Sequence, residues 1–333
     1  MKKRRCRLLL PAIFLMLLLP VAQAGTTDNS PQAWLERMNT ALRKLNYEGN
    51  FVYLRHDRLE TLRVIHRGDA QGGIERIVSL TGPRREIVRD HKNVKCILPA
   101  SRSVLVERRY SATSRLVAAI PANFDTGKLG AYYRFKDLGS DRIAGVRCKV
   151  IGIEPRDGYR YGYKLWLDTR TAMLMRSDLL DRNGQLVERV VFTSLSYPKK
   201  ISDAALAATE IASDYTWNIQ GDSETLLPEE QQLHWQAGSL PPGFALSLSD
   251  VQRVAGVAHP VRHLVYTDGL ASVSVFGELV SPGRKMLIGP SQLGAANAYG
   301  RTIGDRHVTV VGEVPPITVE MIAKSMRLES GQP

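Results

Sequence analysis

The spacing of apolar residues changes near residue 45, and this change predicts a helix followed by a sheet. Apolar side chains recur at intervals of four, four and three from Trp34 to Leu45, which places them in one stripe along a helix. Ser30 is a favourable N-cap for this helix, and Pro31 suits its first position. Because an apolar stripe has to be covered by another element, we expect the helix to pack against a sheet.

From Tyr47 onward the apolar period becomes two, which is typical of strands. The first group of predicted strands is 50–54, 62–66, 74–80, 85–89 and 94–98. The second group is 142–154, 159–168, 173–181 and 185–196. The last two are joined by Asn183-Gly184, the strongest hairpin signal in the chain. Because the connections are short and contain no helices, the pattern predicts an antiparallel meander.

The helix and antiparallel strands predicted so far indicate an α+β fold. A change of composition after them predicts a second domain of the same class. Residues 199–230 are rich in alanine and then in polar residues, so we expect a domain of residues 25–203, a connection at 204–230 and a smaller domain at 231–333. The smaller domain has predicted strands at 259–266, 270–279 and 307–312 and a final amphipathic helix at 317–326.

Two further segments lack a clear period. Residues 110–135 are apolar and predict a short helix and loops lying over one face of the first sheet. Residues 281–304 are rich in Gly, Ser, Ala and Asn and predict a mobile loop.

The first 24 residues have the pattern of a signal peptide. Basic residues lie between Lys2 and Arg7, an apolar run covers 8–19, and Ala22-Gln23-Ala24 is a small-x-small cleavage site. The apolar run is shorter than the roughly 20 residues that span a bilayer, which favours cleavage over an uncleaved anchor. We therefore expect the protein to work as a soluble protein of the periplasm.

The formal net charge of +12 falls on cleavage, because five basic residues belong to the signal peptide. The mature chain stays moderately basic, which suits an acidic protein or the phosphates of a lipid and also serves solubility. Nucleic acid is not an expected partner in this compartment.

Two cysteines, Cys96 and Cys148, remain in the mature chain. The periplasm is oxidising, so we expect them to form a disulfide. The alternative is a reactive thiol or redox pair, but neither cysteine has a CxxC neighbour.

The sequence contains no arrangement typical of an enzyme. It has no GxSxG elbow, no HExxH helix and no phosphate-binding glycine loop. His259 and His263 lie in a predicted strand, where residues four apart stand about 13 Å from one another and cannot share a metal ion. We therefore expect a binding protein without a metal or cofactor.

Aromatic and methionine residues of the second strand group suggest an apolar ligand cavity. The candidate cavity residues are Tyr133, Tyr163, Trp166, Met173 and Met175. An ordinary hydrophobic core would explain the same residues.

Five segments, in order along nearly the whole mature chain, resemble the RseB/MucB family of periplasmic regulators of an envelope-stress sigma factor. These segments are residues 45–53, 144–155, 163–168, 264–276 and 308–315. The resemblance implies a larger, lipoprotein-carrier-like domain with a curved antiparallel sheet and covering helices. It also implies a smaller antiparallel sheet with a C-terminal helix.

The resemblance further implies that the chain binds the periplasmic part of a membrane-anchored anti-sigma factor (RseA or MucA). This binding would shield the anti-sigma factor from the site-1 protease. Lipopolysaccharide or another acylated lipid would release the regulator from the anti-sigma factor. The resemblance also implies that the protein forms homodimers. Tyr266, Arg284 and Lys285 are candidates for partner contact. A lipid or lipoprotein carrier is the alternative, although a simple carrier has no need of the second sheet; a hydrolase would require a catalytic constellation that the sequence lacks.

Overall fold

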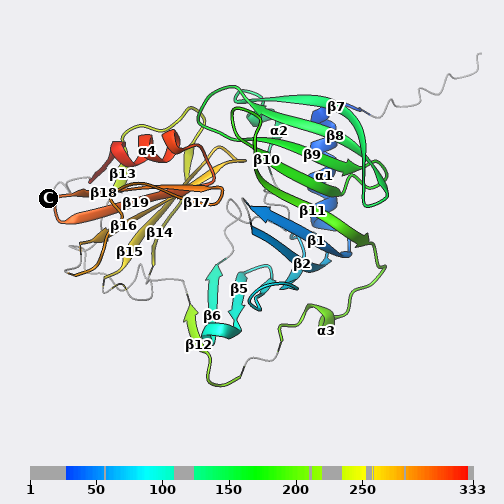
Figure 1. The fold of residues 1–333 in the computed structure, drawn as a ribbon, viewed down its shortest axis with the longest axis horizontal. Helices are drawn as coiled ribbons and strands as arrows, with labels where there is room; N and C mark the ends of the chain where they lie inside the picture. Colours follow the sequence, from blue (N-terminus) through cyan, green and yellow to red (C-terminus); the bar gives the residue numbers. More distant parts are fainter. Residues whose placement is uncertain are drawn as a thin grey trace, which may run out of the picture.

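The computed structural model describes residues 28–55, 58–108, 124–209, 212–219, 235–252, 257, 259–280 and 283–328. The predicted signal peptide lies outside these residues. Two sheets, antiparallel except for one parallel edge pair in the first, lie side by side, each with a helix packed on it (Figure 1). This confirms the predicted α+β class. No helix in the described ranges is long and apolar enough to cross a membrane.

Helix α1 forms where the apolar spacing places it, at Pro31–Lys44. The Ser30 hydroxyl accepts a hydrogen bond from the backbone N–H of Ala33 (3.2 Å), as expected of an N-cap. The apolar stripe, with Leu35 and Met38 completely buried, enters the core of the first sheet. The helix ends at Leu45, whose backbone is extended and leads directly into the first strand.

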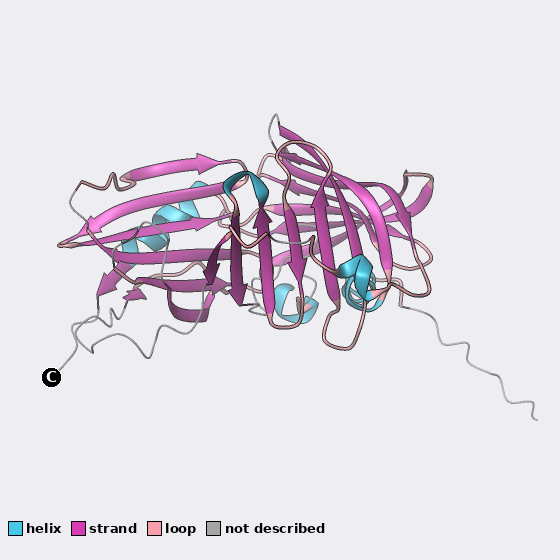
Figure 2. Cartoon of the chain, turned by 90° about the horizontal axis from the view of Figure 1, so that it is seen from below, coloured by secondary structure: helices cyan, strands magenta, loops and turns pink. Residues whose placement is uncertain are grey.

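The first sheet has 12 strands and is strongly curved (Figure 2). Its strands are β1 Tyr47–Arg55, β2 Arg58–Arg67, β3 Ile74–Ser79, β4 Glu86–Arg89, β5 Asn93–Leu98, β6 Ser103–Arg108, β7 Tyr133–Ile143, β8 Val146–Pro155, β9 Gly162–Asp168, β10 Leu174–Leu180, β11 Leu186–Ser196 and β12 Thr216–Ile219. Their order is β12-β6-β5-β4-β3-β2-β1-β11-β10-β9-β8-β7. The strands β1 to β6 form one meander and β7 to β11 form another, and the long-range pairing of β1 with β11 joins the two into one sheet.

The predicted strand 142–154 is wrong at its start. Ala144 and Gly145 both have positive φ (46° and 81°) and form the turn between β7 and β8. Residues 110–123 of the unpatterned segment lie outside the described residues, and the rest forms helix α2, Thr126–Leu129, and the start of β7. The strand β7 was missed because seven of its consecutive residues are exposed, which removes the alternation.

The segment expected to connect the domains also contributes to the first sheet. Helix α3, Asp203–Leu206, covers Ile65 on β2, and β12 pairs in parallel with β6. A short 3-10 helix, η1 Pro99–Ser101, joins β5 to β6.

The second sheet has six strands in the order β14-β15-β16-β19-β18-β17. They are β14 Ala245–Gln252, β15 Val261–Thr267, β16 Ser272–Leu279, β17 Gly289–Leu293, β18 Ala296–Ile303 and β19 Arg306–Gly312. Helix α4, Pro316–Ser325, packs on β18 and β19. The strands β13 Trp235–Ala237 and β20 Met326–Leu328 form a separate pair beside the helix.

The predicted mobile loop at 281–304 is wrong in its second half, which forms the hairpin of β17 and β18. Small residues such as Ala298 and Gly300 give no hydrophobic alternation. The hairpin is held instead by backbone pairing with β19 and by Arg301, which donates a hydrogen bond to the Lys324 carbonyl of α4 (2.7 Å).

A histidine lies inside the second sheet. His263 on β15 stacks on Phe276 with ring centroids 4.5 Å apart. Its Nδ1 lies 3.0 Å from the amide nitrogen of Gln252, and its Nε2 lies 3.1 Å from the Ser274 hydroxyl. An amide N–H donor opposite Nδ1 requires this nitrogen to be unprotonated. Burial lowers the pKa of His263 to about 4.

We predict that this histidine makes the second sheet sensitive to acid. Since its folded pKa lies below the unfolded value of 6.5, its contribution to stability is complete above pH 6.5 and is lost as the pH falls toward 4. The loss is at most about 3 kcal/mol in the free energy of unfolding, measured by urea titration at a series of pH values. His263→Gln should flatten this dependence, leaving the part due to His307, whose pKa burial also lowers. An unchanged pH profile in the variant would contradict the assignment.

Candidate functional site

The five candidate cavity residues, Tyr133 included, all belong to the buried core of the first sheet. Tyr163, Met173 and Met175 are buried in the core of the first sheet. Trp166 is also buried, but its indole N–H donates to Asp141 (2.8 Å) on β7. A role for these residues in ligand binding stays a prediction, and access to the buried ones would require the core to open.

Trp166 anchors a charged cluster on the opposite face of the sheet from Tyr163. The guanidinium of Arg176 lies 4.0 Å from the centre of the Trp166 ring, a cation–π geometry. Arg176 and Arg189 both form ion pairs with the buried carboxylate of Asp178 (2.5 and 2.7 Å). The cluster therefore covers the tryptophan with paired charges.

The three candidates for partner contact lie in different environments. Tyr266 is buried in the second sheet, where its hydroxyl accepts a hydrogen bond from the backbone N–H of Ala237 (3.2 Å). Arg284 and Lys285 are exposed, and Arg284 forms an ion pair with Glu278. Only the two basic residues are therefore open to a partner in this state.

The predicted disulfide is not formed. Cys96 on β5 and Cys148 on β8 are free thiols, with seven strands of the sheet between β5 and β8. A disulfide requires Cα atoms within about 7 Å, whereas neighbouring strands alone are already about 4.8 Å apart. Burial raises the pKa of Cys148 to about 11 and also raises that of Cys96, so neither is an activated thiol.

The two sheets meet at a buried ion pair that the sequence analysis did not single out. Arg160, between β8 and β9, and Asp268, in the turn between β15 and β16, have completely buried side chains. The Arg160 Nε lies 2.5 Å from Asp268 Oδ2, and the Tyr133 hydroxyl donates to the same oxygen (2.9 Å). The other oxygen, Oδ1, accepts from the backbone N–H groups of Leu270 and Ala271 (2.8 and 2.7 Å). Each oxygen of this carboxylate therefore has two donors.

The guanidinium of Arg160 has an acceptor at each of its three nitrogen atoms. It also bonds to Asp157 on its own segment and to the carbonyl of Pro242. The rings of Tyr132, Tyr133 and Phe244 surround it at 4.9, 5.7 and 5.1 Å. Burial and the neighbouring carboxylate raise the pKa of Tyr133 well above its usual value, so the phenol stays protonated and keeps donating.

The backbone at the junction also makes close contacts between the two domains. Gly243 has a φ of +84°, and a Cβ atom there would lie 2.3 Å from the Tyr132 ring. Asn297 donates to the Tyr161 hydroxyl (3.0 Å), and the Thr318 hydroxyl donates to the Tyr159 carbonyl (2.8 Å). The junction therefore holds one defined arrangement of the two sheets.

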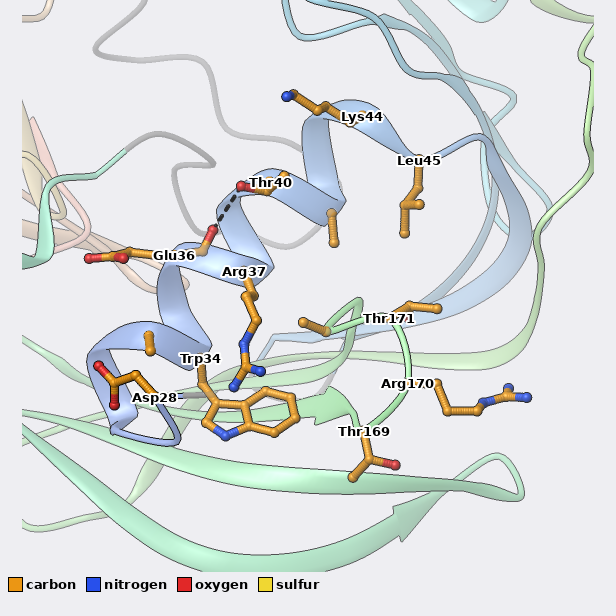
Figure 3. A pocket seen from close by; sticks show the side chains of 13 residues that line it. Asp28, Trp34, Glu36, Arg37, Thr40, Lys44, Leu45, Thr169, Arg170 and Thr171 are labelled. Atoms are coloured by element: carbon orange, nitrogen blue, oxygen red, sulfur yellow. Dashed lines mark hydrogen bonds between the residues drawn. The ribbon is translucent and has the colours of Figure 1, made fainter. Parts of the chain in front are cut away.

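A pocket of about 480 Å³ lies between α1 and the turn at residues 169–172 (Figure 3). Its apolar wall includes Trp34, Leu45 and Ala172. Arg37 points from α1 onto the indole of Trp34, with its guanidinium carbon 4.0 Å from the ring centre. The size and the mixed lining are typical of a small-molecule site.

Comparison with known proteins identifies the family. Residues 30–210 match the MucB/RseB N-terminal domain, and residues 229–327 match the MucB/RseB C-terminal domain. The chain belongs to the MucB/RseB family. The resemblance expected from the sequence is thus confirmed, and because MucB/RseB proteins are regulatory binding proteins, the chain is not an enzyme.

Relatives match over almost the full length. The sigma factor AlgU regulatory protein MucB of Pseudomonas aeruginosa is 32% identical over 322 residues, which are 95% of each chain. The sigma-E factor regulatory protein RseB of Escherichia coli K12 is 29% identical over 314 residues, 93% of this chain and 94% of that one. The structure of the P. aeruginosa MucA/MucB complex matches with a TM-score of 0.70 and 31% identity, covering 90% of this chain and 99% of that chain.

Sequence reasoning missed both Arg160 and Arg37 for simple reasons. Arg160 lies in the predicted strand 159–168, which is wrong at its start because β9 begins at Gly162. Its partner Asp268 is 108 residues away. Arg37 is one basic residue on an amphipathic helix, which is unremarkable until its surroundings are known. The only signal was that Asp268 falls within 264–276, the most specific of the segments that resemble the MucB/RseB family.

We predict that Asp268→Asn destabilises the protein by about 3 kcal/mol, because it leaves the Arg160 cation buried without its main counter-charge. The loss is measured as the change in the free energy of urea unfolding. Asp203→Asn is the matched control, since its carboxylate is 93% exposed and pairs with Arg67. The control should change stability by less than about 1 kcal/mol. An effect of Asp268→Asn as small as that of the control would contradict the role of the pair.

Proposed function

We propose that this protein is a periplasmic regulator that binds the periplasmic part of a membrane-anchored anti-sigma factor. The observation that carries this proposal is the match to MucB in its complex with MucA, at 31% identity over 90% of this chain. A second matching structure is MucB in complex with MucA(peri), with a TM-score of 0.66. The family matches at residues 30–210 and 229–327 include both domains and the junction residues Arg160 and Asp268, which supports the same kind of partner for this chain.

The organisation of the chain suits this role. In this proposal residues 1–24 direct export, and residues 25–203 and 231–333 form the two domains. Residues 204–230 lead from one domain to the other, and within them part of α3 packs on the first sheet and the strand β12 joins it. The mature protein is basic, which favours an acidic partner segment and speeds its association. We place the contact on the second domain, where the exposed Arg284 and Lys285 lie beyond the end of β16.

Binding would regulate by protection and release. A segment held on the surface is inaccessible to the site-1 protease, and lipopolysaccharide or another acylated lipid would release it. Release requires the lipid to bind the free protein more tightly than the complex, since a ligand shifts an equilibrium only by its differential affinity. Assembly as a homodimer is part of the proposal.

A lipid or lipoprotein carrier is the second candidate, and the pocket on α1 is the observation that favours it. A carrier would bind lipid but not the anti-sigma segment. The second domain, which forms an independent core around β15, β16 and α4, has no place in that function.

We predict that the purified mature protein binds the periplasmic segment of the anti-sigma factor and slows its cleavage by the site-1 protease. Affinity is measured by isothermal titration calorimetry, with and without lipopolysaccharide, which should weaken binding. Absence of segment binding in both conditions would contradict the regulatory proposal and favour the carrier.

A pair of charge variants tests the proposed contact. Arg284→Gln with Lys285→Gln should weaken segment binding by about threefold to tenfold, the range expected for two exposed ion pairs. Lys199→Gln with Lys200→Gln removes the same charge from exposed positions of the first domain and is the control. Equal effects of the two pairs would indicate a general charge effect and contradict the assigned contact.

A further inference from the structure

One arginine near the pocket on α1 has hydrogen-bond donors that the protein does not use. The Nε and Nη2 atoms of Arg37 are buried, and no acceptor for either is found among the residues that the structure describes. Burying these two N–H groups without acceptors is unfavourable, because their hydrogen bonds to water are lost and are not replaced. The guanidinium lies over the indole of Trp34, whose face attracts the cation but accepts no conventional hydrogen bond. The carboxylate of Asp28 also interacts with Arg37, because the pKa of that carboxyl is lowered by its hydrogen bonds from Ser30 and also by the charge of Arg37.

The two unused donors have a specific geometry. The N–H groups on Nε and Nη2 lie on one edge of the planar guanidinium and are parallel to each other. This edge matches two oxygens of a carboxylate or a phosphate and binds them bidentately. Lysine cannot present such a pair of donors, because its ammonium group acts as a point charge.

The charges that line the pocket favour an anion. Arg37, Lys44 and Arg170 are its lining cations, and Asp28 and Glu36 are its lining carboxylates. Both carboxylates already accept other hydrogen bonds. Asp28 accepts from the backbone N–H of Ser30 (2.8 Å), and Glu36 accepts from the Thr126 hydroxyl (2.8 Å).

The remaining wall of the pocket is apolar. Trp34, Leu45 and Ala172 supply most of it, together with Ala33 and Ala41 on α1. A volume of about 480 Å³ exceeds what a single inorganic anion fills and accommodates an anionic group with part of an aliphatic chain. If such a molecule entered between α1 and the turn at 169–172, the oxygens of its anionic group would reach the guanidinium. Its aliphatic chain would cover the apolar wall.

We propose that this pocket binds an anionic amphiphile, with Arg37 holding its phosphate or carboxylate group and the Trp34 side receiving the first part of its aliphatic chain. The proposal specifies where the acylated ligand of the proposed function would bind and which head group it would carry. In this respect it rests on the proposed function. It is separate from the buried residues Tyr163, Met173 and Met175.

The experiment measures binding of four probes below their micelle concentrations by calorimetry. Dodecyl phosphate and laurate carry the two anionic groups, dodecyl maltoside carries the same chain without charge, and inorganic phosphate lacks the chain. At least one of the two anionic amphiphiles should bind at least about tenfold more tightly than the maltoside or inorganic phosphate, since both the charged hydrogen bonds and the buried chain contribute. The tighter of the two identifies the source as a phosphate or a carboxylate lipid.

Variants on α1 locate the site. Arg37→Gln should weaken binding of the anionic amphiphile by roughly tenfold to a hundredfold. Arg37→Lys keeps the charge but not the pair of parallel N–H donors, and its affinity should still fall by at least about threefold. Arg43→Gln is the matched control, because Arg43 lies on the same helix and its Nε already donates to the Asn39 carbonyl (3.1 Å). The control should stay within about twofold of the unchanged protein.

Trp34→Phe provides a measurement that does not depend on the arginine variants. Because Trp34 lines the pocket, the amphiphile should change the protein's tryptophan fluorescence, and this change should disappear in Trp34→Phe while calorimetric binding persists. Three results would overturn the proposal: equal binding of charged and neutral amphiphiles, equal losses in Arg37→Gln and Arg43→Gln, or a fluorescence change that survives in Trp34→Phe.

The anti-sigma segment separates this inference from the proposed function. Arg37→Gln should bind the segment as well as the unchanged protein does when no amphiphile is present, and amphiphile should no longer release it. If the unchanged protein binds the amphiphile but not the segment, the site stands and the regulatory proposal fails. If it binds the segment but no anionic amphiphile, the site proposed on α1 fails alone.

Discussion

The relation between the two sheets depends on the burial of Arg160 against Asp268. Removing two charges from water is costly, and an ion pair repays this only when geometry and further hydrogen bonds are nearly complete. Here the carboxylate has four donors and the guanidinium bonds to groups of both domains. Any rotation of one sheet against the other would break several of these bonds together and leave a charge unpaired, so the junction favours one orientation.

This constraint links the core of the first sheet to the second domain. The core is continuous from Trp34 on α1 to Tyr133 at the start of β7, and it includes Leu270 from the second domain. Tyr133 also contacts Asp268 directly. A ligand that moves α1 thus has a packed path to the junction, which is the physical requirement for a ligand that changes the affinity for a partner elsewhere on the molecule.

Local signals in the sequence predicted the elements that local interactions form. The helix at 31–44 followed from apolar spacing and the Ser30 cap, and the β10–β11 hairpin followed from Asn183-Gly184. The β17–β18 hairpin and β7 escaped prediction because their side chains are small or exposed, so pairing with neighbouring strands decides their structure. In such strands backbone hydrogen bonds to the neighbouring strands, and not a pattern of side chains, determine the structure.

The site-level errors have a different cause. The disulfide was expected from compartment and composition, but the pairing order that separates Cys96 from Cys148 is a property of the whole sheet. In the same way, neither the junction pair nor the unused donors of Arg37 can be found without the contacts that form between distant parts of the chain. The family resemblance supplied the regulatory function, but it could not assign these residues.

The most direct test of the junction is a distance measurement between the two domains. Spin labels at Lys200→Cys and Asp305→Cys, both exposed positions, report this distance by electron paramagnetic resonance after Cys96 and Cys148 are replaced by alanine. The account predicts one narrow distance distribution in this background and a broad or shifted distribution when Asp268→Asn is added. Identical narrow distributions with and without Asp268→Asn would show that the buried ion pair does not set the orientation of the two sheets.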